Sequence, residues 1–166
     1  YRKAYYRSFF ATPPGCAVCP RSSRPYHGET RLLIIQNLHR YALYAAVAFV
    51  VILTYDAFCA LFREVNGERR FGIGVGTGVL FVNAFLLAAY TFGCHSWRHL
   101  IAGRLNRFSG PRGPGLAYHA WKRISWLNAR HMLFAWLSLF WVGFTDFYIV
   151  MVATGRITDW NTWGEG

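Results

Sequence analysis

The apolar residues of this chain are gathered in three long blocks and not in short periodic stretches. The blocks cover residues 41–62, 71–94 and 132–153. Each reaches the roughly 20 residues that an α-helix needs to cross the hydrocarbon core of a bilayer. The pattern therefore predicts an all-α fold, an integral membrane helical bundle with three transmembrane helices in the residues shown. The first helix should extend toward the N-terminus, because residues 32–35 continue its apolar pattern.

The connections between the predicted helices differ in length. Residues 63–70 suffice only for a tight reversal, so the first two helices should form an antiparallel hairpin. Residues 101–127 are basic and include a glycine- and proline-rich run at 110–115, which cannot continue a helix and favours a surface loop. The predicted organisation is a segment over 1–31, a transmembrane helical domain over 32–153 and a tail over 154–166. Because the chain begins at Tyr1 without a methionine, we expect a further segment upstream, with room for another helix.

Two segments hold most of the positive charge. Of the 18 Lys and Arg residues, seven precede Tyr41 and seven lie between Cys94 and Met132, whereas these segments contain one acid, Glu29. The positive-inside rule places both segments in the cytoplasm, and the 63–70 connection and the tail on the other side. In a soluble protein the net charge of +11 would suggest nucleic-acid binding. The apolar blocks exclude a soluble fold, so the sequence predicts a multi-pass protein of the lipid bilayer with no nucleic-acid partner.

A Cys-x-x-Cys pair precedes the first helix, on the side predicted to be cytoplasmic. Cys16 and Cys19 stand in the string PPGCAVCP. This spacing lets two thiolates hold one metal centre, while the flanking Pro and Gly fix the turn. The alternative is a redox pair or an incidental pair in a surface loop, because the chain has no second Cys-x-x-Cys. A structural disulfide is not expected in the reducing cytoplasm.

Four histidines lie at helix ends on this same predicted side, together with Cys94. Two of the histidines are four residues apart, so both imidazoles lie on one helical face and can chelate one metal or line one pocket. The alternative is that these residues only mark the polar ends of the helices. The candidate imidazole ligands are His39, His95, His99 and His131.

The predicted helices also carry three polar residues deep within the apolar blocks. These are Asp56, Asn83 and Asp146, one in each helix. Polar groups at such depth need partners. They either line a proton or substrate path or form interhelical hydrogen bonds that fix the helix packing. The sequence favours the second interpretation.

The segment that leads into the third helix interleaves aromatic rings with hydrogen-bond donors. A quinone headgroup near the membrane surface needs this combination of flat apolar walls and donors to its two carbonyl oxygens. An interfacial anchor of Trp and Arg would give the same pattern. The candidate quinone-binding residues are Ser125, Trp126 and Arg130.

Several strings resemble those of the membrane subunit of one class of bacterial succinate dehydrogenase, the respiratory complex II. The strings are PPGCAVCP, HGET, QNLHRY, GCHSWRH and NARHM, and the resemblance covers nearly the whole chain. It implies a subunit of the bacterial inner membrane on which flavoprotein and iron–sulfur subunits dock at the cytoplasmic face. It further implies that a membrane-embedded Rieske-type [2Fe–2S] cluster replaces the usual haem b and that electrons pass to a membrane quinone.

The resemblance also implies a ligand set for the cluster. A Rieske centre takes two thiolates on one iron and two imidazoles on the other. Cys16 and Cys19 would supply the sulfur, and two of the four candidate histidines the nitrogen, with Cys94 able to replace one loop cysteine. The sequence lacks the Cys-x-His and Cys-x-x-His motifs of soluble Rieske proteins, so the choice among these residues stays open.

Three rival functions remain at this stage. An anchor subunit with haem b would use axial imidazoles from the same histidines, but it leaves the Cys-x-x-Cys pair unexplained. A transporter would use the three deep polar residues as a path, but the chain shows no inverted repeat. A non-catalytic membrane anchor would use its basic face to dock acidic partners or anionic lipid.

Overall fold

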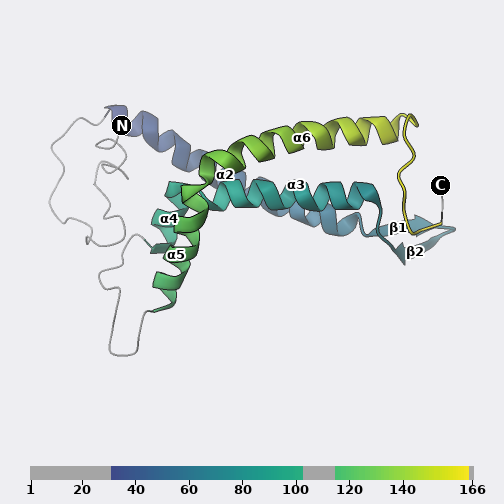
Figure 1. Ribbon diagram of the computed structural model, residues 1–166, viewed down its shortest axis with the longest axis horizontal. Helices are drawn as coiled ribbons and strands as arrows, with labels where there is room; N and C mark the ends of the chain where they lie inside the picture. Colours follow the sequence, from purple (N-terminus) through teal and green to yellow (C-terminus); the bar gives the residue numbers. More distant parts are fainter. Residues whose placement is uncertain (1–30, 103–114, 165–166) are drawn as a thin grey trace. The chain divides into compact units, whose positions relative to one another are not determined.

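The computed structural model describes residues 31–102 and 115–164, which are predominantly helical (Figure 1). Three of its helices are long and apolar enough to cross a membrane, over Tyr41–Cys59, Val75–Phe92 and His131–Ala153. The predicted all-α fold with three transmembrane helices is thereby confirmed. The Cys16–Cys19 pair lies outside the part of the chain that the structure describes. The elements in chain order are α2 Arg31–Cys59, β1 Phe62–Val65, β2 Glu68–Phe71, α3 Val75–Phe92, α4 His95–Ala102, α5 Leu116–Ala129 and α6 His131–Ala153.

A short β-hairpin makes the predicted reversal between the first two spans. Strands β1 and β2 pair antiparallel, with Val65 opposite Glu68, and the turn between them is Asn66-Gly67. Both turn residues have positive φ, 55° and 79°. This is the backbone that a two-residue type I′ turn requires, and Asn-Gly is its preferred sequence. Helix α2 ends at Cys59, earlier than its apolar block, because the chain enters the hairpin, and it begins at Arg31, as the N-terminal extension predicted.

The segment 101–127 is not the loop that its composition suggested. Its second half belongs to helix α5, which follows an extended Gly115 at φ −70° and ψ 165°. The loop prediction was wrong there because the Gly/Pro run ends at this glycine, and the residues beyond it form a helix that buries Ile124 and exposes Lys122 and Arg123. Helix α4 likewise continues to Ala102, into the predicted loop.

The chain divides into two compact units, which are described separately. The first comprises Tyr1–Ala46 with Thr91–His131, and the second comprises Val47–Tyr90 with Met132–Gly166. In the second unit, the indole Nε1 of Trp141 on α6 donates to the carbonyl oxygen of Val79 on α3, at 3.1 Å. The rings of Phe58 on α2 and Phe81 on α3 meet edge to face with centroids 5.2 Å apart. These contacts join its three helical segments.

The tail after α6 closes one end of the second unit by binding the start of α3. The carboxylate Oδ1 of Asp159 accepts hydrogen bonds from the amide of Gly76, at 2.9 Å, and from the hydroxyl of Tyr148, at 2.7 Å. The first amides of a helix have no partner within the helix, and an acid there also meets the positive end of the helix dipole. Asp159 therefore caps α3 from 83 residues further along the chain.

Two glycines just before α3 make room for this tail. A Cβ atom on Gly72 would lie 2.5 Å from Nε1 of Trp163, and one on Gly74 would lie 2.8 Å from Oδ2 of Asp159. The indole Nε1 of Trp163 also donates to the carbonyl oxygen of Arg70 at 3.2 Å. The tail thus holds both α3 and the hairpin through contacts that any side chain at these glycines would block.

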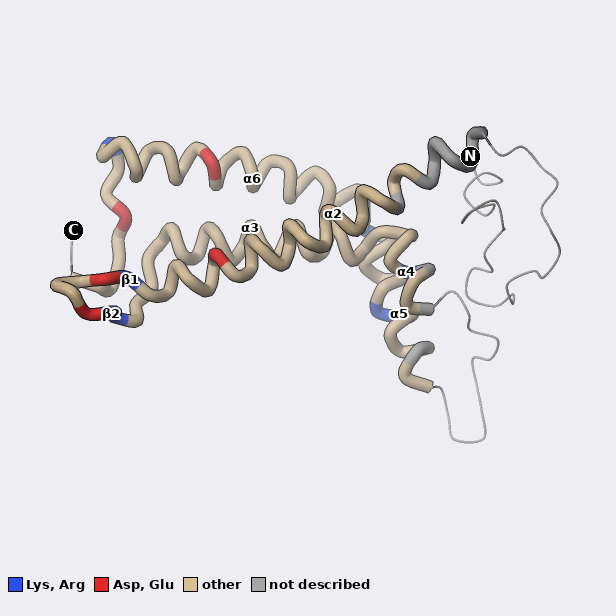
Figure 2. The backbone as a smooth tube through the Cα atoms, turned by 180° about the vertical axis from the view of Figure 1, so that it is seen from behind, with Lys and Arg blue, Asp and Glu red and all other residues tan. Residues whose placement is uncertain are grey.

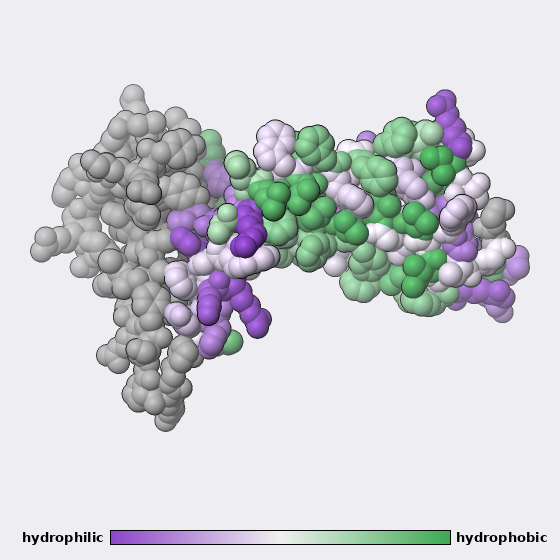
Figure 3. Space-filling view, viewed as in Figure 1, coloured by the Kyte–Doolittle hydropathy of each residue, from purple (hydrophilic) through white to green (hydrophobic). Residues whose placement is uncertain are grey.

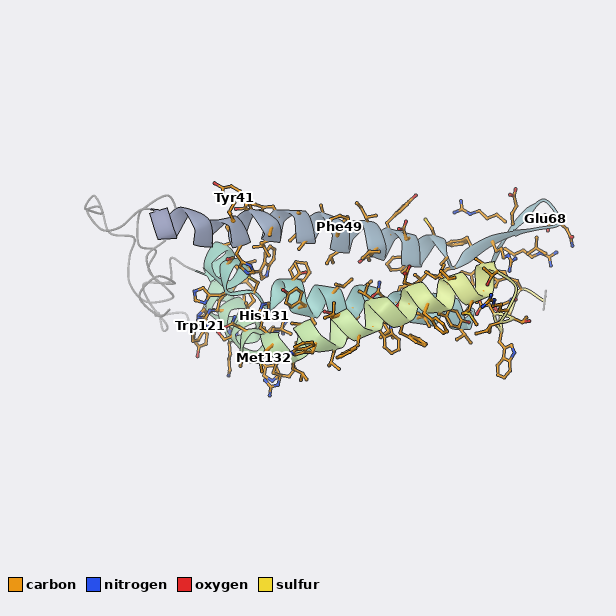
Figure 4. The ribbon with its side chains drawn as sticks, turned by 90° about the horizontal axis from the view of Figure 1, so that it is seen from above. Tyr41, Phe49, Glu68, Trp121, His131 and Met132 are labelled. Atoms are coloured by element: carbon orange, nitrogen blue, oxygen red, sulfur yellow. The ribbon has the colours of Figure 1, made fainter. Side chains whose placement is uncertain are left out.

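The long helices present mainly apolar surface. Along the visible face of these helices, hydrophobic residues alternate with residues of intermediate hydropathy (Figure 3), and charged positions are sparse (Figure 2). Large apolar side chains project outward, among them Phe49, labelled in Figure 4, which is 64% exposed. A surface of this kind is stable against lipid and not against water.

The three deep polar residues do not form the network that the sequence favoured. Asn83 is buried, and its Oδ1 atom has no hydrogen-bond partner among the described residues. Asp56 and Asp146 are both exposed. Among the described residues, the prediction of interhelical hydrogen bonds was therefore wrong for the two carboxylates, because both are exposed and neither bonds to a neighbouring helix.

Candidate functional site

The first unit brings a histidine and a cysteine together from distant parts of the chain. Nε2 of His39, on α2, lies 3.2 Å from Sγ of Cys94, which stands between α3 and α4 and is 4% exposed. Burial alone would raise the pKa of the Cys94 thiol, but hydrogen bonds from His39 and from the backbone of Ser96 outweigh it, so the pKa lies below its usual value. The same contact raises the pKa of His39. Each residue therefore favours the charged form of the other.

An arginine on α4 links a second histidine to α5. Nη2 of Arg98 lies 3.3 Å from Nδ1 of His95, and Nη1 of the same guanidinium donates to Oγ of Ser125 at 3.4 Å. A guanidinium has only donors, so Nδ1 of His95 must accept, and in the neutral ring the proton is on Nε2. The hydroxyl of Ser125 in turn keeps its own hydrogen for another acceptor.

Asparagine and arginine side chains fix the end of α5. Nδ2 of Asn128 donates to the carbonyl oxygen of Gly93 at 2.9 Å, which ties α5 to the turn before α4. The guanidinium of Arg130 lies 4.1 Å from the ring centroid of Trp126 and donates to the carbonyl oxygen of that residue at 3.2 Å. Trp126 is 54% exposed. The pair thus offers a flat ring backed by a cation at the surface of the unit.

The remaining candidates lie on the same unit. His131 begins α6 and is half-buried, and Figure 4 labels it together with Trp121 of α5. His99 lies on α4, four residues after His95. Within 31–102 and 115–164 the structure shows no cluster of three or more His, Cys, Asp or Glu side chains able to hold a metal.

The structure thus assembles part of the set that the sequence suggested. It pairs His39 with Cys94 and joins His95 to Ser125 through Arg98. The sequence analysis did not single out Arg98 as a functional residue. Its position one helical turn after His95 is the signal that would have found it.

Comparisons with known proteins indicate the family of this chain. A family model described as "Actinobacterial succinate dehydrogenase subunit SdhC" matches residues 1–155. A chain of the solved structure "Mycobacterium smegmatis Sdh1 complex in the apo form" is similar, with 46% sequence identity and a TM-score of 0.69. The match covers 99% of this chain and 60% of that chain, so this chain spans less than two thirds of the length of the solved one. No curated protein matches the sequence.

Proposed function

Because this chain belongs to the family of the actinobacterial succinate dehydrogenase subunit SdhC, we propose that it is the membrane subunit of a succinate:quinone oxidoreductase. In this role it relays electrons from a soluble iron–sulfur subunit, through a Rieske-type [2Fe–2S] centre, to a membrane quinone. The flavoprotein and iron–sulfur subunits dock on its basic, cytoplasmic side. The contact between His39 and Cys94 is the observation that carries the proposal, because it places the two ligand types of such a centre side by side.

The donor chemistry of the first unit fits a mixed nitrogen and sulfur centre. His39 and Cys94 are 3.2 Å apart, and the lowered pKa of Cys94 favours the thiolate, which is the form that binds metal. These two residues would hold the centre together with one thiolate from the loop pair, Cys16 or Cys19, and a further imidazole. When bound, the centre supplies one-electron transfer at a potential that imidazole ligation raises.

His99 and His131 are better candidates than His95 for the second imidazole ligand of the centre. A ligating histidine donates its other ring N–H to an acceptor, which fixes the ring and increases its basicity. Nδ1 of His95 instead faces the guanidinium of Arg98, which can only donate. His95 is therefore better suited to orient Arg98 than to bind metal.

The quinone would bind beside α5, near Ser125, Trp126 and Arg130. Arg98 donates to Oγ of Ser125, which directs the Ser125 hydroxyl hydrogen toward a further acceptor such as a quinone carbonyl oxygen. Trp126 supplies a flat, half-exposed wall, and Arg130 lies over its ring. The Trp126 ring would align the quinone ring, while Ser125 and Arg130 would stabilise negative charge on its oxygen during reduction.

EPR and optical spectra of the dithionite-reduced complex, purified with its soluble subunits, test this proposal. We expect a Rieske-type signal that is lost in Cys94→Ser and His39→Ala, with quinone reduction lost and succinate oxidation by an artificial acceptor retained. The matched controls are Cys59→Ser, on α2 in the second unit, and His119→Ala, on the exposed side of α5. A haem b absorption band without the Rieske signal would assign the histidines to haem. A complex with neither signature would leave the chain a non-catalytic anchor.

A further inference from the structure

Helix α3 presents its two sides to different neighbours within the second unit. The ring of Phe81 meets that of Phe58 on α2, with centroids 5.2 Å apart. Val79 meets α6, because its carbonyl oxygen accepts from Nε1 of Trp141 at 3.1 Å. At about 100° per residue, Asn83 lies about 40° from Val79 around the helix and about 160° from Phe81. Asn83 therefore lies on the side of α3 that packs against α6.

The residue of α6 that lies level with Asn83 is Ser138. The two helices run antiparallel, because a Cβ atom on Gly76, near the start of α3, would lie 3.4 Å from Cε1 of Tyr148, near the end of α6. One turn beyond the indole contact described above, α3 reaches Asn83 and α6 reaches Ser138. Ser138 is 4% exposed, so its hydroxyl lies inside the unit.

The carboxamide of Asn83 is a buried polar group at a depth that bulk water does not reach. Asn83 stands at the middle of the candidate span Val75–Phe92 and is 5% exposed. Its Oδ1 atom is buried, and the carboxamide makes no hydrogen bond to the residues that the structure describes. Exchanging the two ends of the amide would bury the donor instead, so the imbalance would remain. A polar group in the hydrocarbon region needs a partner.

The position of Oδ1 and the chemistry around it determine the kind of partner. Because this atom is buried inside the unit, a further helix, of this chain or of another polypeptide, would not reach it without separating α3 from α6. The hydroxyl of Ser138 already donates to the carbonyl oxygen of Ala135 at 3.1 Å, but its oxygen can still accept. The site therefore offers two acceptors and calls for a small, uncharged ligand with two donors, which is water.

We propose that one water molecule binds between α3 and α6 near the middle of the bilayer, where it donates to Oδ1 of Asn83 and to Oγ of Ser138. Buried waters make about two to four hydrogen bonds to groups of this kind. The water adds a further hydrogen-bonded link between the two helices, one turn from the Trp141 bond, and so fixes their register. The inference does not depend on the electron-transfer role.

A density map of the complete complex tests this site. The complex would be purified with its soluble subunits in lipid nanodiscs and resolved well enough to show ordered water. We expect a peak within hydrogen-bonding distance of both the Asn83 carboxamide and the Ser138 hydroxyl, and we expect it to disappear in Asn83→Leu. The matched control is Thr145→Val, which removes another buried hydroxyl of α6, bonded to the Trp141 carbonyl oxygen at 2.8 Å, and should keep the peak.

Three results of the map would overturn the proposal. They are a wild-type chain without a peak at this position, an Asn83 carboxamide bonded directly to a protein group, and a peak that persists in Asn83→Leu. If Asn83→Leu does not accumulate, Ser138→Ala is the milder change, because it removes a single oxygen. It should weaken the peak relative to Thr145→Val, and an unweakened peak would count against the site in the same way.

A double-mutant cycle tests the bridge through its energetics. Steric trapping in bicelles would measure the unfolding equilibrium constant of the full chain, of Asn83→Leu, of Ser138→Ala and of the double variant. Because one water serves both side chains, Ser138→Ala should raise this constant roughly three- to tenfold more when Asn83 is present than in Asn83→Leu. The same cycle with Thr145→Val should show no coupling. If Ser138→Ala has equal effects in both backgrounds, the two side chains share no ligand and the proposal fails.

Discussion

Removing the Asp159 carboxylate should release the tail from the start of α3. Asp159→Ala deletes two hydrogen bonds, from the Gly76 amide at 2.9 Å and the Tyr148 hydroxyl at 2.7 Å, and a negative charge at the helix N-terminus. A hydrogen bond to a charged group contributes about 1.5–3 kcal/mol. A cap contributes about 1 kcal/mol, and that figure already includes the bond to Gly76. Because Asp159 is only half-buried, we take the lower part of these ranges, about 2–3 kcal/mol in all.

Amide hydrogen exchange of the chain in detergent or nanodiscs measures this loss directly. At 1.4 kcal/mol per factor of ten, exchange that requires tail release should speed up by roughly 30- to 140-fold. The reporters are the amide of Val75, bonded to the Trp160 carbonyl at 3.0 Å, and that of Thr162, bonded to the Ile73 carbonyl at 3.0 Å. The two amides should accelerate together, because both bonds break when the tail leaves.

A matched acid in the same unit provides the control. Glu68 pairs with Arg70 at 3.5 Å, but the two side chains are 76% and 54% exposed. A surface pair of this kind contributes about 0–1 kcal/mol, so Glu68→Ala should change exchange at Val75 by no more than a few fold. The capping argument is refuted if Asp159→Ala and Glu68→Ala give the same small change, or if only one reporter responds.

Three further predictions address the glycines, the arginine and the thiol. Gly72→Ala should displace the tail, because the new Cβ would lie 2.5 Å from Trp163, and the fluorescence emission of Trp163 should shift to the red. Gly78→Ala places its Cβ in open space and should leave that emission unchanged. Arg98→Ala should lower quinone reduction by about tenfold or more through loss of the donor to Ser125, with succinate oxidation by an artificial acceptor retained; equal loss of both activities would indicate a structural role instead. His39→Ala should move the pH midpoint of Cys94 alkylation to higher pH, because the hydrogen bond from His39 favours the thiolate. The denatured chain serves as the reference for this midpoint. If the midpoint in the folded chain does not change, the contact between His39 and Cys94 is contradicted.

The spans were predictable because their signal is local, whereas the tertiary contacts were not. Long apolar blocks dictate helices in a bilayer, and the Asn66-Gly67 turn follows from the positive φ that these residues tolerate. The sequence did not identify the partner of His39, because several groups at the same helix ends were equally plausible partners. The role of Asp159 was also hidden, because its partner Gly76 is 83 residues away and only the fold brings them together.

Composition misled the prediction in two places. Helix α5 was interpreted as a loop because basic residues and a nearby Gly/Pro run dominated the average over 101–127, although the residues after Gly115 favour a helix. Asp146 was expected to form a hydrogen bond within the bundle. Its depth in the membrane follows from its position in the apolar block, but the sequence does not show toward which side of the helix the carboxylate points. The orientation of the Asp146 side chain depends on which side of α6 packs against α3, and all sides of that helix are similarly apolar.

The capping of α3 by Asp159 has a consequence for the order of events during synthesis. Helix α3 emerges from the ribosome long before Asp159, so its first amides must be hydrated until α6 has crossed the bilayer and delivered the tail. The bond between Gly76 and Asp159 can then form only in chains whose helix α6 has inserted in the correct direction. The tail thereby distinguishes a chain in which α6 has crossed the bilayer from one in which α3 inserted without it, and the start of α3 stays open to water only in the second.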